Sequence, residues 1–233
     1  MPSASSTDSN SKNARASATG ASNPAQSSTP NSTQMKSSAL ANEAPQAGSI
    51  VLDEAAIQRA LTRIAHEIME RNASAERLYL VAIPNGGVPL ARVLQAKLQE
   101  ISGMLTPVGV LDTTLYRDDL SQDRGKARPL IRNTEMPSAV DGRIVILVDD
   151  VVNTGRTIRA AMDALMDFGR PQSVQLAGLV DRGHRELPIR CDYVGKNVPT
   201  QKNQNVVLRG ENGTLEGSLE VVLLDAAATE ALR

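Results

Sequence analysis

Residues 145–157 read VILVDDVVNTGRT, and this stretch is the strongest indication of the fold class in the sequence. It opens with aliphatic residues typical of a central strand covered on both faces, which we expect at residues 143–148, with Asp149 and Asp150 ending it. A loop containing Gly155 then leads into a helix expected at residues 156–168. A buried strand that passes through a polar turn into a helix is one unit of an α/β fold with a mostly parallel sheet.

Strand and helix patterns alternate outward from this unit. Asp53 is placed to cap a helix whose apolar residues, among them Ile57 and Ile64, recur every three or four positions. The other expected elements are strands at 78–83, 108–116 and 174–180, a helix from the turn at 84–87 through Lys97, loops at 117–133 and 182–196, a left-handed helix stop at Gly169, and a terminal hairpin of 206–209 with 219–223. This order favours right-handed crossovers in one sheet, with ligands bound at the carboxyl ends of its strands.

The first 48 residues differ in composition from the rest. Leu40 is their only Val, Ile, Leu, Phe, Tyr or Trp residue, so they cannot bury enough apolar surface to offset the entropy of ordering. We expect residues 1–48 to form a disordered tail and residues 49–233 to form one domain. The Ser- and Ala-rich start also resembles an organellar transit peptide, but its few basic residues favour the tail.

Charge and cysteine content exclude several classes of protein. The formal net charge is −1, which excludes a generally basic nucleic-acid binder and leaves only a local patch for RNA. The single cysteine, Cys191, excludes an intrachain disulfide and favours a reducing compartment. No stretch is apolar over the roughly 18 residues of a membrane span, so we expect a cytoplasmic protein without a membrane partner.

The loop after the central strand suits a phosphate monoester. Residues 153–157 offer successive backbone N–H groups, the hydroxyls of Thr154 and Thr157, and the positive end of a helix. Asp149 and Asp150 repel a phosphate but suit sugar hydroxyls or Mg²⁺, so the stretch predicts a ribose 5-phosphate pocket. Its spacing is neither that of a Walker A loop nor GxGxxG. Acidic strand ends and Thr-Gly helix starts also occur without any site, and a response-regulator receiver uses an acidic pair, but none of these needs both features in this order.

The same stretch resembles the phosphoribosyl-pyrophosphate (PRPP) motif of type I phosphoribosyltransferases. Three further blocks, LTRIAHEIMERN at 61–72, LYRDDL at 115–120 and VDRGHRELPIRCDYVGKNVPT at 180–200, resemble the bifunctional pyrimidine operon regulators that are also uracil phosphoribosyltransferases. The resemblance spans residues 49–207. It implies a type I phosphoribosyltransferase fold, with a central mostly parallel sheet flanked by helices and a small hood or hairpin on the C-terminal side.

The resemblance implies that uracil N1 displaces diphosphate from PRPP to give UMP, with Mg²⁺ bound together with the diphosphate and not by protein ligands alone. Asp149 and Asp150 would be the catalytic residues, and Arg117, Asp118 and Asp119 would begin a loop that closes over the site. The implied binding residues are, for PRPP and its 5-phosphate, Val145, Ile146, Leu147, Val148, Asp149, Asp150, Val151, Val152, Asn153, Thr154, Gly155, Arg156 and Thr157; for the diphosphate, Asn85, Gly86 and Gly87; and for the base, Val180, Asp181 and Arg182.

The resemblance also implies regulation, in which bound UMP or UTP promotes association with a stem-loop in the leader of pyrimidine (pyr) messenger RNA. On the first helix Arg59, Arg63, His66 and Glu70 fall on one face, a pattern that alone indicates no more than a solvated surface. The implied RNA-facing residues are Thr62, Arg63, His66, Arg71, His184, Arg185, Arg190 and Lys196. Few aromatic residues are available for stacking, so contacts to phosphates and hydrogen bonds would dominate. The family also forms homo-oligomers.

Two positions depart from the family pattern. Pro84 and Asn85 precede the glycines of the diphosphate-side turn, where a Thr, followed by Arg-Gly or Gly-Gly, is common, and Asn153 replaces an aromatic residue in the phosphate loop. Two alternatives therefore stay open: a nucleotide-sensing RNA regulator with little or no turnover, and a non-regulatory phosphoribosyltransferase for another base.

Overall fold

The computed structural model describes residues 48–117, 134–210, 214–225 and 228. In chain order the elements are β1 (Ser49–Leu52), α1 (Glu54–Asn72), β2 (Leu78–Ala82), α2 (Gly87–Ser102), β3 (Val108–Val110), the 3₁₀ helix η1 (Thr114–Tyr116), β4 (Ile144–Val152), α3 (Arg156–Leu165), the 3₁₀ helix η3 (Met166–Phe168), β5 (Ser173–Asp181), β6 (Tyr193–Asn197), β7 (Gln204–Arg209) and β8 (Glu220–Asp225). The expected tail at 1–48, apart from Gly48, lies outside the described residues, as do Asp118 and Asp119.

Five strands form the central sheet in the order β3-β2-β4-β5-β6, and all four pairings are parallel. The α/β fold expected from the sequence is therefore confirmed, and the carboxyl ends of the strands share one edge. The expected terminal hairpin is β7 with β8, and β1 extends it to a three-stranded antiparallel sheet in the order β1-β8-β7. The sequence did not predict β1.

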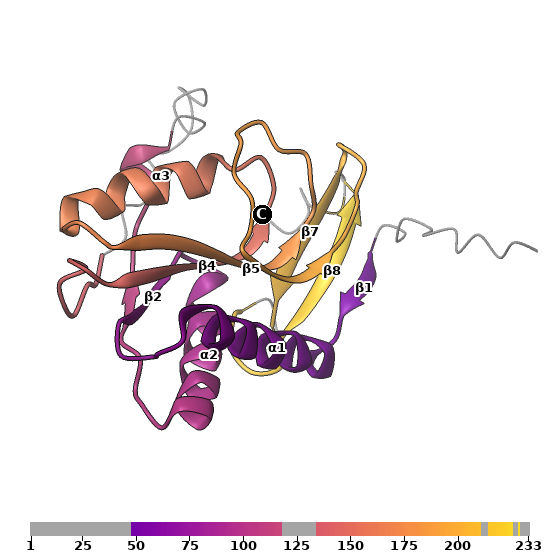
Figure 1. The fold of residues 1–233 in the computed structure, drawn as a ribbon. Helices are drawn as coiled ribbons and strands as arrows, with labels where there is room; N and C mark the ends of the chain where they lie inside the picture. The colour runs from indigo at the N-terminus through magenta and orange to yellow at the C-terminus, as the bar shows by residue number, and fades with distance from the viewer. Residues whose placement is uncertain (1–47, 118–133, 211–213, 226–227, 229–233) are drawn as a thin grey trace, which may run out of the picture. The chain divides into compact units, whose positions relative to one another are not determined.

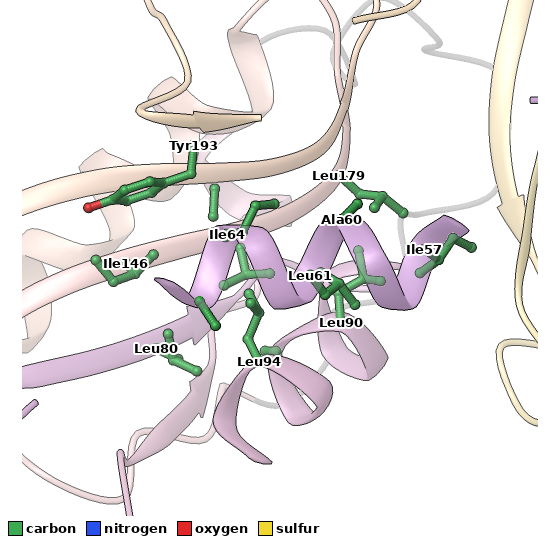
Figure 2. Close-up of a cluster of buried hydrophobic side chains, with 14 of the residues drawn as sticks. Ile57, Ala60, Leu61, Ile64, Leu80, Leu90, Leu94, Ile146, Leu179 and Tyr193 are labelled. Atoms are coloured by element: carbon green, nitrogen blue, oxygen red, sulfur yellow. The ribbon is translucent and has the colours of Figure 1, made fainter. Parts of the chain in front are cut away.

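Helices cover both faces of the central sheet. In β2, Leu78 and Leu80 pack in one cluster with α1 and α2, whereas Tyr79 and Val81 pack in a second cluster with α3. Accordingly, α1 and α2 lie on one side of the sheet and α3 on the other (Figure 1). Figure 2 shows the first cluster, in which side chains of α1 meet those of α2 and of the strands. Burial on both faces explains the aliphatic run in β4.

The first helix begins where its sequence predicts. Asp53 is the N-cap of α1, and its Oδ1 accepts the backbone N–H of Ala56 at 2.7 Å. The buried face of the helix is formed by residues at helical spacing, including Ile57, Leu61 and Ile64. Within the part of the chain that the structure describes, no helix is both long and apolar enough to cross a bilayer.

The central strand is longer than expected and its neighbour is shorter. β4 runs to Val152, so Asp149 lies within the strand, because β5 continues to pair with it as far as Asp181. β3 ends at Val110 instead of reaching residue 116. There Oδ1 of Asp112 accepts both the N–H and the hydroxyl of Thr114, which turns the chain into η1.

Two further expectations were wrong in detail. Gly169 has φ 135° and ψ −169°, so it is not a left-handed stop; the chain leaves η3 toward Asp141, whose carboxylate accepts the N–H of Arg170. Residues 182–196 are not all loop, because β6 begins at Tyr193 and pairs in parallel with β5. Lys196 therefore lies on an edge strand of the sheet.

Candidate functional site

A pocket of about 340 Å³ lies at the carboxyl end of β4. It brings together most of the residues that the sequence assigned to the ribose and the 5-phosphate, and it adds the first residue of the expected closing loop. Its lining consists of Arg117, Asp149, Val151, Val152, Asn153, Thr154, Gly155, Arg156, Thr157, Ile158 and Glu186. The aliphatic residues Val145, Ile146, Leu147 and Val148 do not line the pocket; they are buried in the core on either face of β4.

Two neighbouring carboxylates lie near the carboxyl end of β4: Asp149 lines the pocket, whereas Asp150 is outside its lining and lies half-buried against Gly86. Asp149 is only 6% exposed and lines the pocket, and its Oδ1 accepts the backbone N–H of Asp150 at 3.1 Å. Burial raises the pKa of Asp149 well above its ordinary value, the adjacent Asp150 raises it further, and the guanidinium of Arg117 acts in the opposite direction. Burial also raises the pKa of Asp150. Both carboxyl groups therefore bind a proton more readily than exposed ones, and groups that donate to the carboxylates would lower both pKa values.

The turn after β2 packs directly against this acidic pair. A Cβ atom placed on Gly86 would lie 2.3 Å from Cγ of Asp150, and one on Gly87 would lie 2.3 Å from the carbonyl oxygen of Val148. Only glycine fits at both positions, so the backbone of the turn closely approaches the end of β4. Asn85 is exposed, and the peptide bond between Pro84 and Asn85 is cis. The structure thus brings the predicted diphosphate-side turn next to the predicted catalytic pair.

The loop between β4 and α3 presents backbone N–H groups. Gly155 has φ 93°, a left-handed conformation that glycine tolerates, and α3 starts at the next residue. In the described residues, the backbone N–H groups of Asn153, Thr154 and Gly155 donate to no other backbone group. The first N–H groups of α3 also lack intrahelical acceptors, as at any helix start. Such a row of donors at a positive helix end can hold a phosphate.

A salt bridge lies at the pocket wall. Nε of Arg156 donates to Oε2 of Glu186 at 2.8 Å, and both residues line the pocket. Sequence reasoning did not assign Glu186 to the site. The contact joins the first residue of α3 to a residue thirty positions later in the chain, so no local spacing could have indicated it.

A second pocket of about 380 Å³ shares Asn153, Thr154 and Glu186 with the first one. Its other lining residues are Arg182, His184, Arg185 and Lys202, of which Lys202 was not predicted. The carboxamide oxygen of Asn153 is buried and has no hydrogen-bond partner among the described residues.

The residues predicted to border the base are directed partly into the protein. Val180 is fully buried. The guanidinium of Arg182 is also buried, which lowers its pKa, and it donates to Thr200, Gln204 and Asn205. Arg182 therefore connects the end of β5 to the start of β7, and its contacts fix that part of the fold.

The described residues contain no group of three or more His, Cys, Asp or Glu side chains that could hold a metal ion. Asp149 and Asp150 are neighbouring carboxylates at the carboxyl end of β4, and two carboxylates leave most ligand positions of Mg²⁺ to other oxygens. The donor set therefore fits a Mg²⁺ ion that arrives with a phosphorylated substrate.

Of the eight predicted RNA-facing residues, four lie on α1 and one, Lys196, lies on β6, and these two elements pack together. Nη2 of Arg63 donates to the carbonyls of Val194 and Gly195 on β6 at 3.0 and 2.6 Å. Arg71 pairs with Asp192 at 2.6 Å. Half of each arginine side chain remains exposed.

The other predicted RNA-facing residues differ in exposure. Thr62, His66, Arg190 and Lys196 are exposed, and the hydroxyl of Thr62 donates within α1. His184 is exposed with its Nε2 at 2.8 Å from the carbonyl oxygen of Thr200. Arg185, by contrast, is directed toward the loop after β4. The structure therefore does not place all eight residues on one open surface.

Comparison with known proteins agrees with this geometry. A family model described as "Phosphoribosyl transferase domain" matches residues 48–209. The chain is similar to "Bifunctional protein PyrR" of Pelotomaculum thermopropionicum, with 55% identity over 177 residues that cover 76% of this chain and 96% of that protein. It is also similar to "Bifunctional protein PyrR" of Deinococcus radiodurans, with 57% identity over 173 residues, 73% of this chain and 92% of that protein.

Solved structures show the same fold. A hypoxanthine phosphoribosyl transferase of Trypanosoma cruzi superposes with a TM-score of 0.59 and 19% identity, covering 80% of this chain and 98% of that one. A hypoxanthine phosphoribosyltransferase of Staphylococcus aureus gives a TM-score of 0.55 and 17% identity, covering 77% of this chain and 94% of that one. At these identities the likeness concerns the fold alone.

Proposed function

The chain belongs to the phosphoribosyl transferase domain family and groups within it with the bifunctional PyrR proteins, and from this premise we propose how its pocket works. The chain is a regulator of pyr gene expression that also has uracil phosphoribosyltransferase activity. The reaction joins N1 of uracil to C1 of PRPP, releases diphosphate and gives UMP. One observation carries the assignment of the site: a single pocket is lined both by Asp149 and by residues 153–157.

The two halves of the pocket divide the recognition of ribose 5-phosphate. The phosphate accepts hydrogen bonds from the loop and from the hydroxyls of Thr154 and Thr157, while the ribose hydroxyls donate to Asp149 and Asp150. Donation from the sugar stabilises the carboxylates and offsets the burial that raises their pKa values. As the bond from C1 to diphosphate breaks, the ring becomes positive, and the nearby negative charge stabilises that state.

The diphosphate occupies the side of the pocket bounded by the turn of Asn85, Gly86 and Gly87. The absence of Cβ atoms lets backbone N–H groups of the turn approach the leaving group, although this chain has no hydroxyl or basic side chain at Pro84 or Asn85. Mg²⁺, when bound with PRPP, neutralises part of the diphosphate charge, and Asp149 or Asp150 would hold it from the protein side. Arg117 stands beside Asp149 where the expected closing loop begins.

Uracil is proposed to lie beside the end of β5, bordered by Val180, Asp181 and Arg182. The side chains of Val180 and Arg182 are buried, so only their backbone groups are expected to contact the base. The side chain of Arg182 contributes indirectly, because it holds the start of β7 in place. The side chain of Asp181 is held by a salt bridge with Arg185, whose Nη2 lies 2.6 Å from Oδ2 of Asp181.

The regulatory function requires an RNA surface, and we assign it to α1 and β6 with the adjoining Arg190. These two elements pack together, and both carry exposed hydrogen-bond donors, including Arg63, His66 and Lys196. The partner is a stem-loop of the pyr leader, bound when UMP or UTP occupies the pocket, and the protein acts in the cytoplasm as a homo-oligomer.

The test compares UMP synthesis with UMP binding in two variants. Asp150→Asn is expected to reduce the rate of UMP formation from uracil and PRPP by at least a hundredfold and to retain the folded state by circular dichroism. Asp163→Asn, which changes an exposed carboxylate on α3, serves as the matched control with an unchanged rate. An unchanged rate in Asp150→Asn would refute the site.

The same assays separate the open alternatives. Wild-type protein that binds UMP but forms none from uracil would be a regulator without turnover. Faster turnover with hypoxanthine, guanine or orotate than with uracil would identify a phosphoribosyltransferase for another base.

A further inference from the structure

We propose that Arg185 is a positioning residue that holds the loop after β4 in the shape that binds a 5-phosphate. The proposal rests on the assignment of that loop to the phosphate of UMP and PRPP. It gives Arg185 a different role from the RNA contact that the resemblance implies. Only 19% of its side-chain surface is exposed.

The guanidinium of Arg185 donates from all three nitrogens to acceptors inside the protein. Nη1 donates to the carbonyl oxygens of Val152 at 3.2 Å and Asn153 at 2.5 Å. Nε donates to the carbonyl of Ile189 at 2.9 Å, and Nη2 pairs with Asp181 at 2.6 Å. The planar fork of arginine fixes several acceptors in one geometry, which the single ammonium group of lysine cannot do.

The clamped carbonyls determine where the loop's N–H groups point. In a trans peptide the C=O and N–H bonds point in opposite directions. The carbonyls of Val152, Asn153 and Thr154 all accept hydrogen bonds from residues 182–187. The N–H groups of the three following residues therefore point away from that segment, and we infer that they face the 340 Å³ pocket that the loop lines.

One of these peptides depends on Arg185 alone. The carbonyl of Val152 also accepts the N–H of Arg182 at 3.1 Å, and that of Thr154 accepts the N–H of Glu186 at 3.0 Å. For the carbonyl of Asn153, the described residues supply only Nη1 of Arg185. Without Arg185 the peptide between Asn153 and Thr154 is free to rotate, and the N–H of Thr154 loses its direction toward the phosphate.

The test measures the preference for UMP over uridine, because the two ligands differ only in the phosphate. Isothermal titration gives both affinities for the full chain, for Arg185→Gln and for Arg185→Lys, with Arg92→Gln as a control at an exposed arginine of α2. In Arg185→Gln we expect UMP affinity to fall about tenfold, the effect of one lost charge-assisted hydrogen bond, and uridine affinity to stay unchanged. The UMP affinity of Arg185→Lys should fall by less, and both affinities of Arg92→Gln should match those of the wild type.

The outcomes are distinct. If Arg185→Gln keeps the wild-type preference for UMP over uridine, the proposal is overturned. This also holds if the variant loses affinity for RNA while that preference is unchanged. An equal loss for UMP and uridine also overturns it, because Arg185 would then support the domain as a whole. Wild-type protein with no preference for UMP would instead overturn the phosphate site on which the proposal rests.

Discussion

Gly86→Ala tests the contact between the diphosphate-side turn and the catalytic pair. The new Cβ would lie 2.3 Å from both Cγ and Oδ2 of Asp150. Ordinary van der Waals contact begins at 3.4 Å, so the carboxylate must retreat by about 1.1 Å. A displacement of about 1 Å in a catalytic group lowers the rate on the order of a hundredfold, which corresponds to about 2.7 kcal/mol of lost transition-state stabilisation.

The assay is kcat/KM for UMP formation from uracil and PRPP, measured together with thermal stability. The new Cβ also lies 2.6 Å from Cβ of Asp150, which side-chain rotation cannot move. We therefore expect the rate to fall about a hundredfold and the free energy of unfolding to fall by about 1–3 kcal/mol, with the protein still folded at 25 °C. Near-normal kcat/KM in a folded Gly86→Ala protein would refute the proposed closeness of the turn and the reacting carboxylate.

Gly87→Ala is a second test of the turn, and Gly103→Ala is the matched control. In Gly87→Ala the Cβ meets the backbone oxygen of Val148 at 2.3 Å, so we expect a loss of about 1–3 kcal/mol in unfolding free energy. Gly103, at the end of α2, has φ 73° and open space around it. Gly103→Ala is expected to cost about 1–2 kcal/mol through backbone strain and to keep kcat/KM unchanged.

Three further predictions concern pH, RNA and stability. Because ribose hydroxyls favour the carboxylate, UMP affinity should rise with pH through the raised pKa of Asp149, and calorimetry on Asp149→Asn should show that this rise is lost. The stability of the free protein depends on pH in the opposite direction, because the fold favours the protonated carboxyl of Asp149. The contribution of Asp149 to the unfolding free energy is full below its ordinary pKa of 3.8 and is lost as pH rises through the raised pKa. Arg63→Ala combined with Arg190→Ala should reduce the slope of log affinity against log salt for leader RNA by about 0.7–0.9 per lost phosphate contact, and an unchanged slope would exclude this surface. Asp53→Ala should lower the unfolding free energy by about 1 kcal/mol in denaturant titration with UMP synthesis intact, because it removes the cap of α1.

The periodic parts of the fold follow from local sequence. The cap at Asp53 and the helical spacing of α1 specify that helix, and the aliphatic run of β4 specifies a strand buried on both faces. The loop at 153–157 could be recognised because its chemistry lies in consecutive residues. These signals need no knowledge of distant contacts.

The remaining features depend on partners far apart in the chain. β4 continues past Asp149 because β5 pairs with it there, and β6 forms because β5 offers a free edge. The role of Arg185 likewise comes from carbonyls more than thirty residues away. A sequence block shows that such an arginine is present but not whether it faces RNA or its own backbone.

A crystal structure of the chain with UMP would show whether this pocket binds the ribose 5-phosphate. We expect the phosphate to accept hydrogen bonds from the backbone N–H groups of the loop at 153–157 and the ribose hydroxyls to donate to Asp149 and Asp150. A UMP molecule bound elsewhere, or with its ribose turned away from these two carboxylates, would contradict the assignment.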